Sequence, residues 1–189
     1  MDNDPPTITA TASPAPNAAG WNNTDVTVTF TCDDATSGVA TCPAPVVVSA
    51  EGASQVISGT ATDRAGNTAT ASVTVSLDKT RPVITATASP APNAAGWNRS
   101  DVTVSFTCTD ALSGVAVCPE PFLVTTESAS QVISGTATDR AGNTASASVT
   151  VKLDKTPPSL AITSPANLTL TAGANTIAAK ATDVAGNEQ

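Results

Sequence analysis

Apolar and polar residues alternate along most of this chain, which is the pattern of half-buried β-strands. The clearest runs are residues 26–30, VTVTF, and residues 73–77, VTVSL. Valine and threonine suit such strands because their branched side chains pack well on a pleated surface. Few segments show the 3.6-residue period of a helix, so the alternation predicts an all-β fold.

Proline clusters and a glycine turn divide the first part of the chain into six expected strands. These are residues 7–12, 25–32, 38–42, 45–50, 55–62 and 69–77. The last two are joined by the turn DRAGN at 63–67, where Gly66 can adopt the positive φ that closes a bulged hairpin. Short strands at this spacing predict a β-sandwich.

The whole pattern occurs twice. Residues 7–80 align without a gap on residues 83–156, and 59 of the 74 aligned pairs are identical. The segment TATDRAGNTA, at 60–69 and 136–145, returns in part as KATDVAGN at 180–187. We therefore expect an N-terminal tail (1–3), a first module (4–79), a second module (80–155) and a third element (156–189). The third element lacks a cysteine segment, and we expect it to be shortened or incomplete.

Each module carries two cysteines, Cys32 with Cys42 and Cys108 with Cys118. Four cysteines allow three pairings, and the repeat symmetry favours one disulfide within each module. Free buried thiols are the alternative, while zinc is disfavoured because the chain has no histidine. Disulfides require an oxidising compartment, so the cysteines predict a secreted or cell-surface protein.

Two segments carry a family resemblance: GWNNTDVTVTFTCDDATSGVATCP at 20–43 and SGTATDRAGNTATASVTVSLDKT at 58–80. Together they resemble the bacterial Ig-like repeats of long extracellular proteins, and the resemblance covers essentially the whole chain. It implies tandem small β-sandwiches with Ig-like or fibronectin-III-like topology. Such modules serve as stalks, adhesin shafts and spacers beside enzyme domains, so the fold alone does not select a function.

Composition disfavours several classes of function. Without histidine the usual nucleophile–base triads are unavailable, and we expect that the protein is not an enzyme. The formal charge of −8 disfavours nucleic acids and anionic membrane surfaces as partners. No apolar run approaches the ~20 residues of a membrane-spanning helix, so we expect no membrane insertion.

Acidic residues are expected to gather at one pole of each module. In an Ig-like sandwich the N-terminus, the loop after the second strand and the last hairpin share a pole. The expected sets are Asp78, Asp110, Asp139 and Asn143 in the second module; Asp2, Asp34, Asp63 and Asn67 in the first; and Asp154, Asp183 and Asn187 in the third element. Oxygen ligands of this kind suit calcium. The alternative is that these residues form ordinary turns, with Arg64 and Arg140 neutralising the carboxylates.

The leading hypothesis is a non-catalytic spacer or stalk in a secreted or cell-surface protein, stiffened by calcium and joined to neighbouring modules of a longer chain. The linkers DKTRP at 78–82 and DKTPP at 154–158 support it because they leave little slack. The alternative is an adhesin or carbohydrate-binding module that recognises glycan or protein. In that case Trp21 and Trp97 would stack on a sugar, whereas in a plain sandwich they would cover the end of the core.

Overall fold

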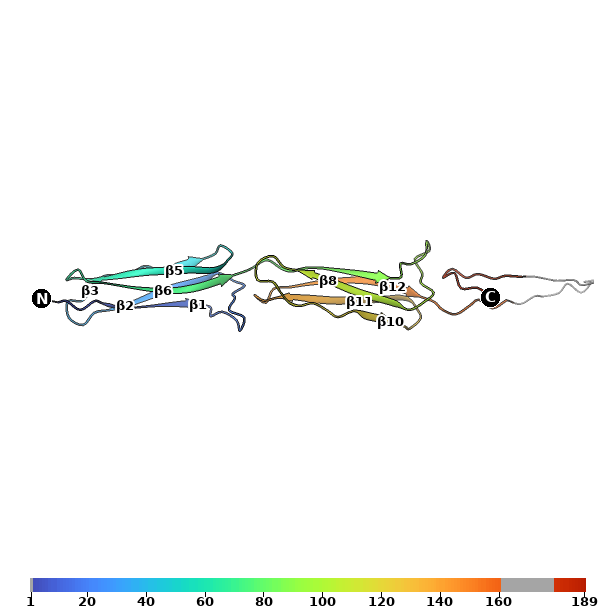
Figure 1. The fold of residues 1–189 in the computed structure, drawn as a ribbon, viewed down its shortest axis with the longest axis horizontal. Helices are drawn as coiled ribbons and strands as arrows, with labels where there is room; N and C mark the ends of the chain where they lie inside the picture. Colours follow the sequence, from blue (N-terminus) through green and yellow to red (C-terminus); the bar gives the residue numbers. More distant parts are fainter. Residues whose placement is uncertain (1, 161–178) are drawn as a thin grey trace, which may run out of the picture. The chain divides into compact units, whose positions relative to one another are not determined.

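The computed structural model describes residues 2–160 and 179–189, and every regular element in this part of the chain is a β-strand (Figure 1). The all-β class expected from the alternation is confirmed. No helix in the described residues is long and apolar enough to cross a membrane.

The first repeat contains six strands in two sheets. They are β1 (Thr7–Ser13), β2 (Val26–Asp33), β3 (Val39–Thr41), β4 (Val46–Val48), β5 (Gly52–Asp63) and β6 (Thr68–Leu77). One sheet has the order β1-β2-β4 and the other the order β3-β5-β6. Strand β1 pairs antiparallel with β2, and β5 and β6 form a long antiparallel hairpin. Five of the six strands start within a residue of the expected position.

The second repeat has the same strands in the same order. They are β7 (Val83–Ser89), β8 (Val102–Thr109), β9 (Val115–Val117), β10 (Phe122–Val124), β11 (Ser128–Asp139) and β12 (Thr144–Leu153). The sheets are ordered β10-β8-β7 and β12-β11-β9, which matches the first repeat strand for strand.

A small aliphatic core joins the two sheets of each repeat. In the first repeat the buried side chains are Val26, Val28, Phe30, Val48, Val75 and Leu77, which come from β2 and β4 of one sheet and β6 of the other. The second repeat buries Val102, Val104, Val124, Val151 and Leu153 in the same way. Two sheets that share one core are consistent with a β-sandwich.

Strand β5 begins at Gly52, three residues before the expected start. The pairing register with β6 shifts between Gly52 and Gln55, and Ser54 has a φ of 53° within this irregularity. The Gln55 amide donates to the carbonyls of Ala50 and Gly52 and thereby closes the bend. Residues 52–54 carry no large apolar side chain, so the alternation could not include them in the strand.

The two disulfides expected from the cysteine spacing are present, Cys32–Cys42 and Cys108–Cys118. Cys32 lies in β2 and Cys42 directly follows β3, so this bridge connects the two sheets of its repeat. Closing a loop of this length stabilises the fold by about 2–3 kcal/mol in the chain-entropy model. The disulfides suggest an oxidising environment.

The chain forms two compact units. One combines residues 1–84, 108–118 and 136–145, and the other combines residues 85–107, 119–135 and 146–189. The division runs through the second repeat and not through the linker at 78–80, so the module boundaries stay a prediction. The expected shortening of the third element concerns mainly residues 161–178, which lie outside the described residues.

Gly59 provides a test of how tightly the first repeat packs. A Cβ atom at this position would lie 2.7 Å from Cγ of Pro43 and 2.8 Å from Cε1 of Phe30. We expect Gly59→Ala to destabilise the repeat by about 1–3 kcal/mol in urea unfolding, because overpacking outweighs the loss of unfolded-state entropy. The matched control is Gly52→Ala, where the nearest atoms belong to the flexible Gln55 side chain. Equal stability of the two variants would contradict this account of the packing.

Candidate functional site

In each repeat an aspartate and an asparagine together close the turn of the last hairpin. In the first repeat the Asp63 N–H donates to the Asn67 carbonyl at 3.0 Å, and the Asn67 N–H donates to Oδ1 of Asp63 at 2.8 Å. Nδ2 of Asn67 donates to Oδ2 of Asp63, also at 2.8 Å. Gly66, at φ 96°, makes the turn possible. The same bonds recur between Asp139 and Asn143 and between Asp183 and Asn187.

The same asparagines also hold the segment that enters each repeat. Nδ2 of Asn143 donates to the carbonyls of Asp78 and Thr80, at 2.9 and 3.1 Å. Asn67 and Asn187 make the equivalent bonds, to Asp2 and Asp4 and to Asp154 and Thr156. The side-chain amides thus serve as donors that tie the entering segment to the last hairpin. This leaves the carboxylates as the candidate metal ligands.

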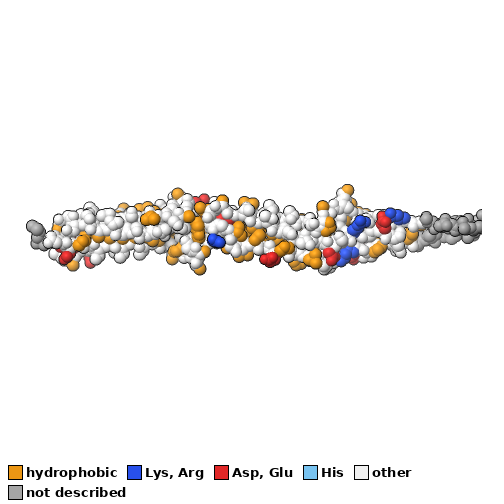
Figure 2. Space-filling model, in the orientation of Figure 1, with side chains coloured by type: hydrophobic (Ala, Val, Ile, Leu, Met, Phe, Trp, Pro, Cys, Tyr) orange, Lys and Arg blue, Asp and Glu red, His pale blue; other side chains and the backbone are white. Residues whose placement is uncertain are grey.

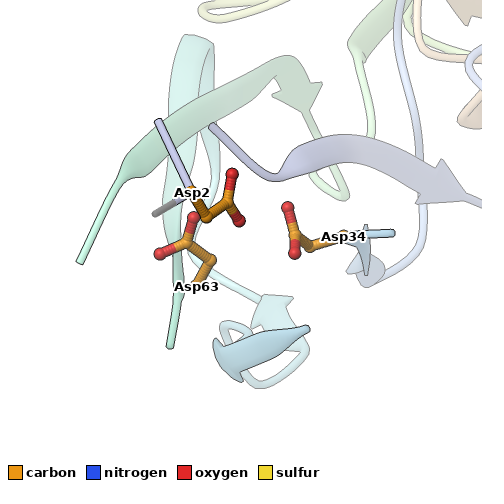
Figure 3. Close-up of side chains that lie close together, drawn as sticks. All are labelled: Asp2, Asp34 and Asp63. Carbon is orange, nitrogen blue, oxygen red and sulfur yellow. The ribbon is translucent and has the colours of Figure 1, made fainter. Parts of the chain in front are cut away.

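Three carboxylates meet at the entering pole of each complete repeat. The first group is Asp2, Asp34 and Asp63, and the second is Asp78, Asp110 and Asp139, each with one oxygen per residue within 4.8 Å of the others. Figure 3 shows the Asp34 carboxyl group facing that of Asp2, with Asp63 beside it. The set expected in the third element contains only two carboxylates, those of Asp154 and Asp183. Within residues 2–160 and 179–189, three carboxylates therefore come together at the first two poles.

Burial distinguishes the second group from the first. Asp78 is fully buried and Asp139 is 1% exposed, while Asp110 is half-buried. Backbone N–H groups hold these side chains: Ser113 donates to Asp78 at 3.0 Å, and Gly114 donates to Asp110 at 2.6 Å. In residues 2–160 and 179–189 the ion pairs are Lys79–Asp25, Lys155–Asp101 and Lys180–Glu188, and none includes a grouped carboxylate.

Hydrogen bonding sets the acidity of Asp63 and Asp183. Burial acts to raise the pKa of Asp63, but the side-chain and backbone N–H donors of Asn67, with the N–H groups of Gly66 and Ala65, outweigh it. The net effect holds the pKa of Asp63 below its ordinary value, and the pKa of Asp183 is lowered for the same reasons. Asp63 therefore stays ionised at neutral pH, although it is only 2% exposed.

A second polar cluster anchors the linker to the repeat that precedes it. The Lys79 N–H donates to Oε1 of Glu51 at 2.5 Å, and the Thr80 hydroxyl donates to the same carboxylate at 3.1 Å. The Lys79 ammonium group binds Asp25 and the Ser49 carbonyl, both at 2.8 Å. We call this cluster the linker clamp.

The linker clamp recurs after the second repeat, with Lys155, Thr156, Glu127, Asp101 and Thr125 in the equivalent places. The N–H of Lys155, the Thr156 hydroxyl and the nearby ammonium charge together lower the pKa of Glu127 against the effect of burial. Sequence reasoning missed both clamps. The available signal was the identity of these acids and lysines in the two repeats, but nothing in the sequence told which acid meets which lysine.

The tryptophans are half-buried, and neither belongs to the buried core of its repeat. Each instead closes a loop: the N–H of Trp21 donates to Oδ1 of Asn17, and its carbonyl accepts from the Asn17 N–H. The Lys152 ammonium group lies 5.9 Å from the centroid of the Trp97 ring. Neither Trp is among the apolar side chains that pack against the buried core clusters.

Comparison of the sequence with protein-family models, with curated proteins and with solved structures found no match. The functional argument therefore depends on the geometry of the two carboxylate groups, the Asp–Asn turns and the linker clamps. These features share one property: each involves the segment by which the chain enters or leaves a repeat.

The acidity of Asp63 gives a testable pH dependence. Because its pKa is lowered on folding, its stabilising effect is fully present above the ordinary value of 3.8 and is lost as the pH falls below it. We expect Asn67→Ala to raise the pKa of Asp63 in a carboxyl-detected NMR titration, since the largest hydrogen-bond contribution disappears. The acid unfolding transition of the first repeat should then begin at a higher pH. An unchanged Asp63 titration in Asn67→Ala would show that the asparagine does not set this acidity.

Proposed function

We propose that this chain is a non-catalytic spacer of a secreted or cell-surface protein, built from tandem Ig-like or fibronectin-III-like sandwiches. The observation that carries the proposal is the linker Asp78-Lys79-Thr80. Lys79 and Thr80 are bonded to the first repeat, and Asp78 and Thr80 are bonded to the second. A connection of this kind transmits orientation from one module to the next, which is what a spacer needs.

Two sets of bonds act on this short linker from opposite sides. Glu51 and Asp25 of the first repeat hold Lys79 and Thr80. Ser113 and Asn143 of the second repeat hold the Asp78 carboxylate and the Asp78 and Thr80 carbonyls. All of these residues belong to the first compact unit. A flexible tether would leave its backbone groups to water, whereas here the protein satisfies them.

The character of the surface also favours a spacer. Figure 2 shows a face on which neutral polar side chains and backbone predominate and charged side chains are few. Strands of alternating threonine and alanine, such as Thr68–Ala71, present this kind of surface. For a glycan-binding module an open aromatic platform is expected, and the half-buried Trp97 with Lys152 near its ring is a poor one.

Calcium is the proposed stiffener of the poles. Carboxylates this close repel one another, and the repulsion grows where water is excluded, as at Asp78 and Asp139. A divalent cation with a preference for oxygen ligands would relieve this repulsion, and flexible coordination suits a group drawn from three separate segments. Extracellular modules often bind calcium with dissociation constants of about 10⁻⁴–10⁻³ M.

We expect calcium to raise the melting temperature of the chain relative to a melt in chelator. At ten times the dissociation constant the stabilisation is about 1.4 kcal/mol, which corresponds to several degrees for domains of this size. Magnesium should do less, because it gives up its water reluctantly. Asp110→Asn should remove part of the shift while it keeps the oxygen that accepts from Gly114, and Asp4→Asn, an exposed acid outside the groups, should keep it. If the wild-type melting curves in calcium and in chelator coincide, the poles are ordinary turns and do not bind calcium.

Residual dipolar couplings test the spacer itself. In the wild-type chain we expect the couplings of the first and second repeats to fit one alignment tensor. Glu51→Ala removes the acceptor of both Lys79 N–H and the Thr80 hydroxyl, so we expect faster amide exchange at Lys79 and separate tensors for the repeats. The control is Glu120→Ala, an exposed acid in the loop before β10. Separate tensors in the wild-type protein would make the chain a flexible tether and refute the spacer.

A further inference from the structure

A third contact links consecutive repeats, and it involves the loop before the second strand. In the first compact unit, Nδ2 of Asn17 donates to the carbonyl of Arg140 at 2.8 Å. In the second compact unit, Nδ2 of Asn93 donates to the carbonyl of Val184, also at 2.8 Å. Asn17 and Asn93 occupy the same place in loops of identical sequence, PAPNAAGWN. Arg140 and Val184 occupy the same place in the turns Asp-x-Ala-Gly-Asn.

The burial of the turn alanine shows whether a loop of the preceding repeat lies against the turn. Ala141 and Ala185 are each 4% exposed, whereas Ala65, in the same turn of the first repeat, is exposed. The turns at 63–67 and 139–143 are identical in sequence, and the identity extends over residues 53–69 and 129–145. Local sequence therefore does not explain the difference in burial. The difference follows from whether a preceding loop lies against the turn.

Recognition in this contact is mostly by backbone. The acceptor is a main-chain carbonyl, so it serves equally in Arg140 and in Val184. A neighbouring side chain of the loop adds a second point of contact: Arg99 donates to the Gly186 carbonyl at 3.1 Å, and Asn23 lies beside Gly142. The required features are thus a small alanine, a glycine at positive φ and two accessible carbonyls.

We propose that the loops Pro14–Asn23 and Pro90–Arg99 are docking sockets for the Asp-x-Ala-Gly-Asn turn of the next repeat. It follows that the turn Asp63–Asn67 of the first repeat is a docking surface whose partner is the socket loop of another repeat of the same type. In residues 2–160 and 179–189 no socket asparagine donates to Arg64 or Gly66. The partner is specified by chemistry: a loop that offers an asparagine amide donor to the turn carbonyl and covers the turn alanine.

The socket asparagine has two roles, and one substitution can remove the second role while it keeps the first. Oδ1 of Asn17 accepts from the N–H groups of Ala19 and Trp21 and so holds the loop, while Nδ2 donates to the next repeat. Asn17→Asp keeps an oxygen for the loop and replaces the donor with a charged acceptor that faces the Arg140 carbonyl. The substitution should release the turn and leave the loop intact.

The test uses ¹⁵N–¹H NMR of the full chain, with Gly66 as the internal reference for an undocked turn. In the wild type we expect different amide shifts for Gly66 and Gly142. Asn17→Asp and Ala141→Glu should each move the Gly142 resonance towards that of Gly66 and speed its exchange. Ala65→Glu is the matched control, and it should leave Gly142 and the melting temperature unchanged.

A chain with residues 2–77 duplicated ahead of Asp2 tests the free turn. Gly66 of the internal copy should then shift to the position of Gly142, and Asn17→Asp in the added copy should reverse the shift. An unmoved Gly142 in Asn17→Asp, or an unmoved Gly66 in the duplicated chain, would overturn the proposal. The proposal rests on the spacer function but can fail independently of it. If the wild-type repeats fit one alignment tensor and Gly142 does not move in Asn17→Asp, the socket is refuted and the spacer function is not.

Discussion

The rest of the structure depends on a buried carboxylate that accepts both the main-chain and the side-chain N–H of the asparagine closing its turn. Asp63 and Asp139 each lie at the end of a long strand, almost out of contact with water, with an asparagine four residues later as the principal donor. A polar side chain in such a place is tolerated only when its hydrogen-bonding atoms are satisfied. Because the same asparagine also donates to the entering backbone, one interaction fixes the hairpin and the incoming chain together.

This arrangement explains why so small a core is sufficient. Each repeat buries valines, a leucine and at most one phenylalanine, and modules of this size are marginal on hydrophobic burial alone. The disulfide adds a covalent constraint between the sheets. The hydrogen bonds at the pole add stability that would otherwise require a larger apolar core. The repeats thus concentrate their specific polar contacts at the ends and leave the middle to alternating strands.

Much of this fold could be predicted from the sequence, because strand alternation is a local signal and the 76-residue repeat can be found by aligning the sequence with itself. The alternation indicated β2 and β6 well, and the cysteine spacing indicated both bridges. The alternation could not indicate the start of β5, since residues 52–54 have no large apolar side chain. The grouping of Asp78, Asp110 and Asp139 was predictable from topology. The roles of Asn143, Glu51 and Asn17 were not, because each joins residues more than 25 positions apart and leaves no periodic trace.

The socket contact is made mostly with main-chain atoms. This has a consequence for how genes that encode such repeats gain and lose units. Unequal recombination between near-identical repeats adds or removes a whole unit, and the new neighbours always meet through the same loop and the same turn. Side chains elsewhere can drift, as they have at the position of Arg140 and Val184, without creating a mismatched partner. The number of repeats in such a chain could therefore change in steps of one, with no compensating substitutions at the new boundary.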